Sequence, residues 1–168
     1  LAQLLRKSLR EERNTNVEII EGDVLQLLPS FFSRYTLHAT RYKLISNIPY
    51  YLTSRMLRMV FESSSKPCLV VLTIQKEVAE RIAAHPPDMS ILALSVQAYG
   101  RPEIIKTVPA SCFYPPPQVD SAIIKISGIS DSFFTSYSVP EKYFFRIIKI
   151  GFASKRKQLA GNLAIGLD

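Results

Sequence analysis

Asn47, Ile48, Pro49 and Tyr50 form a short polar and aromatic segment between two apolar elements. Asn47 offers a side-chain carbonyl oxygen and an amide donor. Pro49 lacks an N–H, fixes its own φ and keeps Ile48 extended, so the Ile48 carbonyl is held rigidly without a helix or ladder partner. Tyr50 adds a flat aromatic face beside these acceptors. Two acceptors and a stacking surface suit a planar ligand with an amino group, such as a nucleobase.

The chemistry that such a site favours is attack by the exocyclic amine of a purine. This nitrogen is a poor nucleophile because its lone pair is delocalised into the ring, and its low basicity makes a general base unnecessary before attack. Two carbonyl acceptors would bond its protons, favour a pyramidal nitrogen and stabilise the positive charge that develops there. The same four residues also suit a simple turn, because Asn and Pro are common turn formers.

The composition indicates a soluble globular domain. The chain has 168 residues, of which 47% are hydrophobic and 21% are charged. No apolar run is long enough to span a membrane. Cys68 and Cys112 fit neither a zinc pattern nor a disulfide scaffold, which favours reduced thiols in a cytoplasmic protein. His38 and His85 share no metal-ligand spacing, so we expect no metal site.

The net charge of +7 is compatible with nucleic acid or an anionic membrane surface as a partner. Its distribution is uneven. Residues 139–168 contain six basic and two acidic residues, so +4 of the +7 lies in the last thirty residues. A cluster of three bases, Lys155, Arg156 and Lys157, follows an aromatic-rich helix there, and this position favours phosphate contact over plain surface charge.

Hydrophobic periodicity predicts an α/β fold with a mainly parallel sheet. Strands are expected at 17–23, 43–48, 68–74, 103–108 and 121–126. Helices are expected at 1–13, 24–32, 55–61, 76–84, 90–99 and from 140 onward. Thr53 is the expected N-cap of the third helix, and Gly100 is the expected residue after the fifth. In such sheets a ligand binds outside the carboxyl ends of the strands, where Asp23 and Asn47 are both expected.

Three sequence motifs follow one another along the chain: 47–50 (Asn-Ile-Pro-Tyr), 75–81 (Gln-Lys-Glu-Val-Ala-Glu-Arg) and 113–122 (Phe-Tyr-Pro-Pro-Pro-Gln-Val-Asp-Ser-Ala). Together they resemble the KsgA/RsmA family of ribosomal RNA adenine dimethyltransferases, from about Val17 to the end of the chain. The resemblance implies S-adenosylmethionine as cofactor and small-subunit rRNA as partner. The implied reaction places two methyl groups on N6 of each of two adjacent adenosines, and the implied enzyme is a monomer linked to ribosome biogenesis.

The resemblance also implies a fold and its division. Residues 1–130 would form a truncated Rossmann-like, S-adenosylmethionine-dependent methyltransferase domain. Residues 131–168 would begin a small all-helical C-terminal domain that binds RNA, and Phe152 to Leu159 is similar to a basic helix of that domain.

Site roles follow from the resemblance residue by residue. Asn47 and the Ile48 carbonyl, braced by Pro49, would bind the target amine, while Tyr50 and Phe113 would contact the adenine. The cofactor-binding residues would be Asp23, Val24 and Asn47, and the phosphate contacts would come from Lys155, Arg156 and Lys157.

Two of these residues have structural alternatives. Asp23 would accept from the adenine amino group of the cofactor, with the Val24 backbone N–H beside it, but Asp23 also suits a helix cap. Phe113 also suits a core position.

The chain departs from the family at its start. The family opens with a glycine-rich loop for the methionine part of the cofactor and an acidic strand end for the ribose, and no Gly-x-Gly occurs here. We therefore expect a fragment of a longer enzyme that, alone, binds cofactor weakly and is inactive. Two other functions stay open: a large-subunit rRNA adenine methyltransferase of the antibiotic-resistance type, and a non-catalytic RNA-binding or assembly module.

Overall fold

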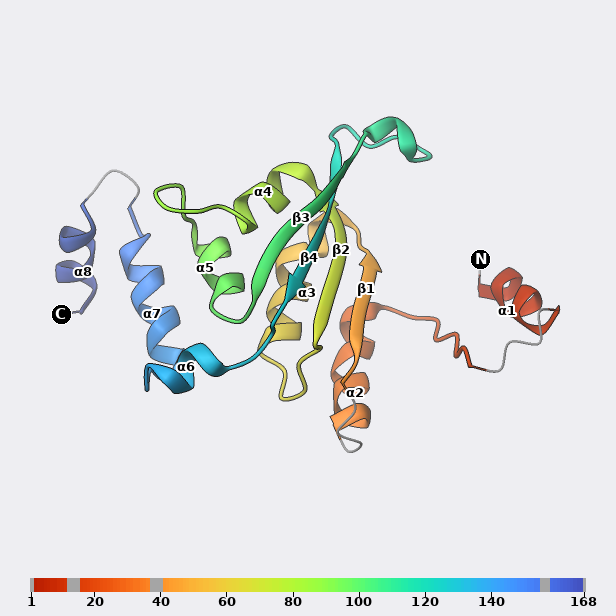
Figure 1. The fold of residues 1–168 in the computed structure, drawn as a ribbon, viewed down its shortest axis with the longest axis horizontal. Coiled ribbons are helices and arrows are strands. Elements are labelled where there is room, and N and C mark those ends of the chain that lie inside the picture. Colours follow the sequence, from red (N-terminus) through yellow and green to blue (C-terminus); the bar gives the residue numbers. More distant parts are fainter. Residues whose placement is uncertain (1, 12–15, 37–40, 155–157, 168) are drawn as a thin grey trace.

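The computed structural model describes residues 2–11, 16–36, 41–154 and 158–167 (Figure 1). Four strands form one sheet in the order β1-β2-β4-β3. Their bounds are β1 Lys43–Asn47, β2 Leu69–Gln75, β3 Arg101–Val108 and β4 Ser121–Ser127. Each of the last four predicted strands is therefore confirmed to within two residues.

The sheet is mixed, so the prediction of a mainly parallel sheet is wrong for these strands. β1 and β2 are parallel, whereas β4 is antiparallel to both β2 and β3. The connections explain the difference. A helix, α3 (Thr53–Phe61), lies between β1 and β2, and such a crossover gives parallel strands. Only a loop joins β3 to β4, so that pair returns as a hairpin.

One face of the sheet carries the core. Val70 and Leu72 of β2 lie opposite Ile126 and Ile124 of β4, and all four side chains are buried. The other face is more open, because alternate residues of β2 are only half-buried and Ile45 on β1 is 73% exposed. Helices pack on the buried face: α3, α4 (Lys76–Ile82) and α5 (Ile91–Gln97) contribute Val60, Ile82 and Val96 to the core.

The predicted strand at 17–23 is not formed. Residues 17–21 have no regular secondary structure and run from α1 (Ala2–Glu11) to α2 (Val24–Thr36), away from the sheet (Figure 1). None of the four described strands pairs with this segment. A strand forms only beside another strand, so the apolar pattern alone does not make one here.

Two predicted helix boundaries are also wrong. Thr53 does not cap α3, because a 3-10 turn, η1 (Tyr50–Leu52), precedes the helix and the Thr53 hydroxyl donates to the Tyr50 carbonyl. Gly100 does not adopt the left-handed conformation of a helix-ending glycine. Its role is close packing, since a Cβ there would lie 3.0 Å from the carbonyl oxygen of Ser127 on β4.

The C-terminal part of the described chain is helical. It contains α6 (Ser132–Ser136), α7 (Glu141–Gly151) and α8 (Leu159–Leu167), which lie beyond α5 (Figure 1). The expected basic helix from Phe152 to Leu159 is wrong where the chain is described, because α7 ends at Gly151 and α8 starts at Leu159. The Asn162 side chain donates to the Gly151 and Ser154 carbonyls and thereby ties α8 to the end of α7. The boundary at residue 131 stays a prediction.

Within the described residues, no helix is both long and apolar enough to cross a membrane.

Candidate functional site

The carboxyl edge of the sheet brings together residues that are far apart in the sequence. Asn47 is the last residue of β1 and pairs with Thr73. Gln75 ends β2 and lies opposite Ser121, the first residue of β4. The loop between β3 and β4 leaves from this same edge (Figure 1). The segments that begin at Asn47, Gln75 and Phe113 therefore converge at this edge.

The backbone of the Asn47–Tyr50 segment has the shape that its proline requires. Pro49 has φ −56° and ψ 136°, and its carbonyl accepts from the Leu52 N–H at 2.9 Å. The Ile48 side chain is 5% exposed and anchors the segment in the core. Among the loop and turn hydrogen bonds of the described chain, the Ile48 carbonyl accepts none. Asn47 is exposed at the strand end. Two acceptors are therefore available beside Tyr50.

Tyr50 is held by a hydrogen bond that spans the sheet. Its hydroxyl lies 2.8 Å from the Ser121 Oγ, across 71 residues of sequence, and Ser121 is fully buried. The Tyr50 carbonyl accepts from Thr53 Oγ1 at 3.0 Å. The ring is thus fixed at its hydroxyl end and at its backbone. A ring whose position is set by tertiary contacts can hold a stacked base at low entropic cost.

Asp23 has the capping contact that the sequence left open. One carboxylate oxygen, Oδ1, accepts from the Leu25 N–H at 2.9 Å, and the Asp23 carbonyl accepts from Gln26 and Leu27 at 3.0 Å each. The second carboxylate oxygen, Oδ2, has no partner in the part of the chain that the structure describes. Val24 is the first residue of α2, where backbone N–H groups have no intrahelical acceptor. A capping role therefore leaves one acceptor and one donor for a ligand.

Phe113 lies outside the hydrophobic core, so its core alternative is not realised. It is half-buried and extended (φ −113°, ψ 153°) after a second 3-10 turn, η2 (Ala110–Cys112). Asp120 fixes both ends of this loop. Its Oδ1 accepts from the Ala110 N–H at 2.9 Å, and its carbonyl accepts from the Lys76 N–H at 3.0 Å. The Phe113 loop is therefore attached to the start of α4.

Sequence reasoning gave no role to Ser121 or Asp120. Both belong to the segment 113–122. Ser121 forms a hydrogen bond with the Tyr50 hydroxyl, and Asp120 accepts one from the Ala110 N–H. The available signal was their position at the entry of a strand, directly after a proline-stiffened loop. Lys155, Arg156 and Lys157 lie outside the described residues, so their predicted contact with RNA stays a prediction.

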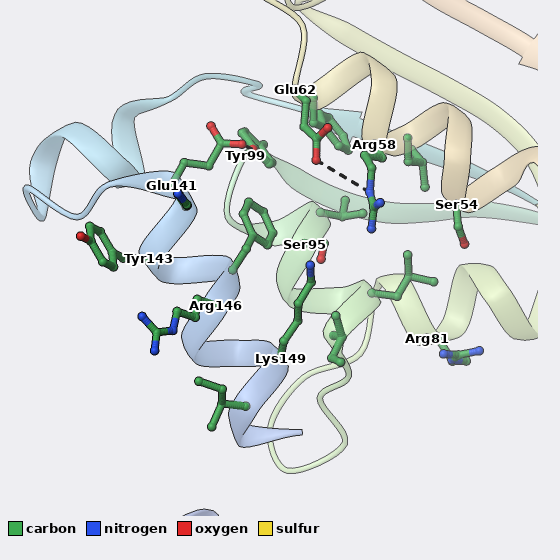
Figure 2. A pocket seen from close by; sticks show the side chains of 18 of the residues that line it. Ser54, Arg58, Glu62, Arg81, Ser95, Tyr99, Glu141, Tyr143, Arg146 and Lys149 are labelled. Carbon is green, nitrogen blue, oxygen red and sulfur yellow. Dashed lines mark hydrogen bonds and ion pairs between the residues drawn. The ribbon is translucent and has the colours of Figure 1, made fainter. Parts of the chain in front are cut away.

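The structure also contains a cavity of about 1230 Å³, and it does not coincide with this edge. It lies between α3, α5 and α7 (Figure 2). None of Asp23, Asn47, Tyr50 and Phe113 lines it. The cavity and the carboxyl edge of the sheet are therefore two separate features of the molecule.

The described residues contain no group of three or more His, Cys, Asp or Glu side chains that could hold a metal ion.

The fold and this edge are those of a Rossmann-like methyltransferase, and comparison with known proteins gives the family. The family model "Ribosomal RNA adenine dimethylase" matches residues 1–166. The chain is 41% identical over 152 residues to the ribosomal RNA small subunit methyltransferase A of Dehalococcoides mccartyi strain 195, covering 90% of this chain and 50% of that protein. It is 37% identical to the protein of the same name from Halothermothrix orenii, covering 95% of this chain and 54% of that protein.

Solved structures agree. A dimethyladenosine transferase from Plasmodium falciparum superposes with a TM-score of 0.78 at 27% identity, covering 96% of this chain and 55% of that one. The 23S rRNA methyltransferase ErmE superposes with a TM-score of 0.72 at 18% identity, covering 98% and 62%, which shows a shared fold. The chain belongs to the ribosomal RNA adenine dimethylase family. It spans about half the length of the curated relatives named above.

Proposed function

We propose that this chain supplies the adenine-binding part of an enzyme that dimethylates N6 of two adjacent adenosines in small-subunit rRNA. The observation that carries the proposal is the Asn47–Tyr50 segment at the carboxyl edge of the sheet. There Tyr50 is hydrogen-bonded to Ser121 and the Ile48 carbonyl has no acceptor role in the turn. The relatives carry the name small subunit methyltransferase A, which supports the choice of RNA.

The residues of the edge perform the chemistry by positioning. The target adenine stacks on the Tyr50 ring, with Phe113 as a second aromatic contact. The two amine hydrogens donate to Asn47 Oδ1 and to the Ile48 carbonyl. These bonds turn the nitrogen lone pair out of conjugation and stabilise the positive charge that develops during attack. No side chain has to remove a proton first, because the amine is neutral before attack.

S-adenosylmethionine fits the family as the methyl donor and, when bound, supplies a methyl group activated by a sulfonium. The residues present suit its adenine end: Asp23 Oδ2 can accept from the adenine amino group, and the Val24 N–H can donate to the ring. Asn47 would hold the target amine beside the methyl group to be transferred. The methionine and ribose parts find no glycine-rich loop or acidic strand end in this sequence.

The proposed partner is small-subunit rRNA or a precursor of the small subunit, bound by a cytoplasmic monomer. Lys155, Arg156 and Lys157 are proposed to contact its phosphates. The net charge of +7 supports binding to a polyanion.

The other functions are less well supported. ErmE shares only the fold at 18% identity, so it gives little support for a large-subunit substrate. A non-catalytic RNA-binding module would have no need of a free Ile48 carbonyl beside an exposed Asn47. Primer extension on both ribosomal RNAs of a deletion strain separates the two substrates, since only the small-subunit signal should vanish.

The decisive test is Asn47→Ala in the gene that encodes the protein, expressed in a strain that lacks the native enzyme. Loss of one amine acceptor should lower dimethylation at least 100-fold, in the range measured for single oxyanion-type donors. Dimethylation is read by primer extension, and RNA affinity by filter binding. Gln118→Ala, an exposed amide in the loop at the same edge, is the matched control and should keep full activity. Substantial turnover by Asn47→Ala would refute the role of Asn47.

A further inference from the structure

The cavity between α3, α5 and α7 has a charge pattern that the adenine site does not explain. Five of its lining residues are basic and two are acidic. The bases come from three helices: Arg58 from α3, Arg81 from α4, and Lys142, Arg146 and Lys149 from α7. The three on α7 recur at intervals of four and three residues, which places them along one side of that helix.

The two acids of the cavity are already engaged. Glu62 lies 3.7 Å from the Arg58 guanidinium. Glu141 accepts a hydrogen bond from the Tyr99 hydroxyl at 2.5 Å. Arg81, Lys142, Arg146 and Lys149 form no ion pair with any residue that the structure describes. The cavity therefore has a positive charge that the folded chain itself does not neutralise.

Two of these cations lie on different helices of the cavity wall. Arg58 comes from α3 and Lys149 from α7, and both line the same cavity as Ser95 of α5 (Figure 2). Of the five bases, Arg58 alone has an acidic partner among the described residues, and both side chains of that Arg58–Glu62 pair are more than half exposed. An exposed pair of this kind is weak, so Arg58 can still bind an anion together with Lys149. A phosphate suits this place, because it accepts from guanidinium, ammonium and hydroxyl donors at once.

The other residues that line the cavity indicate which class of phosphate compound it would bind. The cavity volume of about 1230 Å³ exceeds what one inorganic phosphate needs. Apolar side chains form its floor, including Leu57, Leu92 and Val96. The exposed Tyr143 ring stands at its border, 59% accessible. A basic groove with an apolar floor and an aromatic ring is the pattern of sites that bind single-stranded nucleic acid.

Two helices connect the cavity to the adenine site. Ser54, on the first turn of α3, lines one end, and α3 follows directly on the Asn47–Tyr50 segment. Arg81 lies on α4, whose first residue Lys76 is bonded to the Phe113 loop. An RNA strand with its target adenine on Tyr50 would follow these two helices to the cavity.

We propose that this cavity binds the phosphodiester backbone of the substrate RNA beside the target nucleotides, with Arg58 and Lys149 as its main phosphate contacts. The proposal rests on the proposed function, because it assigns a second RNA site to the same enzyme. It is separate from the cluster at 155–157, and its residues come mostly from the sheet domain helices and α7.

The test measures binding of a fluorescent RNA hairpin, with two adjacent adenosines in its loop, to the 168-residue chain over a range of salt concentrations. Removing both phosphate contacts in Arg58→Gln/Lys149→Gln should weaken binding roughly tenfold and lower the salt slope by about 1.4–1.8. Arg101→Gln/Lys106→Gln is the matched control, since it removes the same charge from exposed positions on β3. The control should keep the parent slope.

A second double variant distinguishes loss of phosphate contacts from an effect on folding. Arg58→Lys/Lys149→Arg keeps both charges and should restore the parent slope, whereas a purely structural role would not be rescued. Equal slopes for the cavity variant and the control overturn the inference and leave the proposed function intact. Loss of slope in the cavity variant, together with full dimethylation by Asn47→Ala, supports the inference and refutes the catalytic proposal. Absence of RNA binding by the parent chain overturns both.

Discussion

The carboxyl edge of the sheet and the cavity beside α7 present opposite kinds of surface. At the edge, the polar groups are mostly uncharged. Two of them are the Ile48 backbone carbonyl and the Asn47 side-chain amide. They lie at a strand end, where Ser121 holds the Tyr50 ring and Asp120 holds the Phe113 loop. In the cavity, most of the polar groups are charged and belong to long side chains, and they line a space between α3, α5 and α7.

Under the proposals made above, this difference assigns the chemistry to the edge and the affinity for RNA to the cavity. Backbone carbonyls keep their positions without losing side-chain entropy, so a strand end suits a reaction that depends on exact placement. Long basic side chains adjust to a flexible backbone and attract it over a distance, so they suit binding. The comparison predicts that substitutions at the edge change activity and substitutions at the cavity change affinity.

The strongest test of this division is Tyr50→Ala. Loss of the stacking ring should reduce dimethylation roughly 100-fold, because the base loses both attraction and alignment. Tyr50→Phe keeps the ring and loses only the hydrogen bond to Ser121, so its loss should stay below about tenfold. Tyr51→Ala removes an 84% exposed neighbouring ring and should have little effect. The division fails if Tyr50→Ala weakens RNA binding as much as it weakens activity.

The cavity wall can be tested through its stability. Tyr99 stacks on Phe61 and Phe145 with centroid distances of 5.2 and 6.2 Å, and its hydroxyl reaches Glu141 at the start of α7. Tyr99→Phe removes only this hydrogen bond to a charged acceptor and should lower the free energy of unfolding by about 2 kcal/mol. Urea denaturation measures the change. Tyr143→Phe is the control, because this exposed ring lies on α7 with Glu141. It should not shift the midpoint of urea denaturation.

The smallest expected effect is on the pH dependence of stability, to which Tyr42 beside the sheet and Tyr99 beside the cavity contribute separately. Burial raises the pKa of Tyr42, next to β1, to about 12. Burial, followed by the hydrogen bond and charge of Glu141, raises the pKa of Tyr99 above its ordinary value. Both rings hold their protons more tightly when folded. The stability that they contribute is therefore complete below about pH 10, the pKa of an unfolded tyrosine, and is lost as pH rises beyond it.

Denaturation midpoints at about pH 8, 10 and 11 check this sign. The parent chain should lose stability above pH 10 more steeply than either Tyr42→Phe or Tyr99→Phe. Tyr42→Phe should remove the part of the pH dependence of stability that arises beside the sheet. Tyr99→Phe should remove the part that arises at the cavity wall. A parent chain that gains stability above pH 10 would contradict the burial of both hydroxyls.

Much of the local structure could be predicted from the order of residues. The strand at 43–47, the extended backbone at Pro49 and the amphipathic helix before Glu62 all follow from neighbours within a few positions. The segment at 17–23 shows the limit of this reasoning. Its apolar pattern is that of a strand, but a strand forms only when another supplies its ladder, and periodicity carries no information about that partner.

The sequence by itself determined which groups could bind an amine and that they follow a strand, because proline and strand propensity act on adjacent residues. Only the tertiary structure decided that Ser121 holds Tyr50, that β4 lies between β2 and β3, and that Arg58 and Lys149 line the same cavity. Such pairs are separated by some seventy to ninety residues, and their contact depends on how the whole core packs.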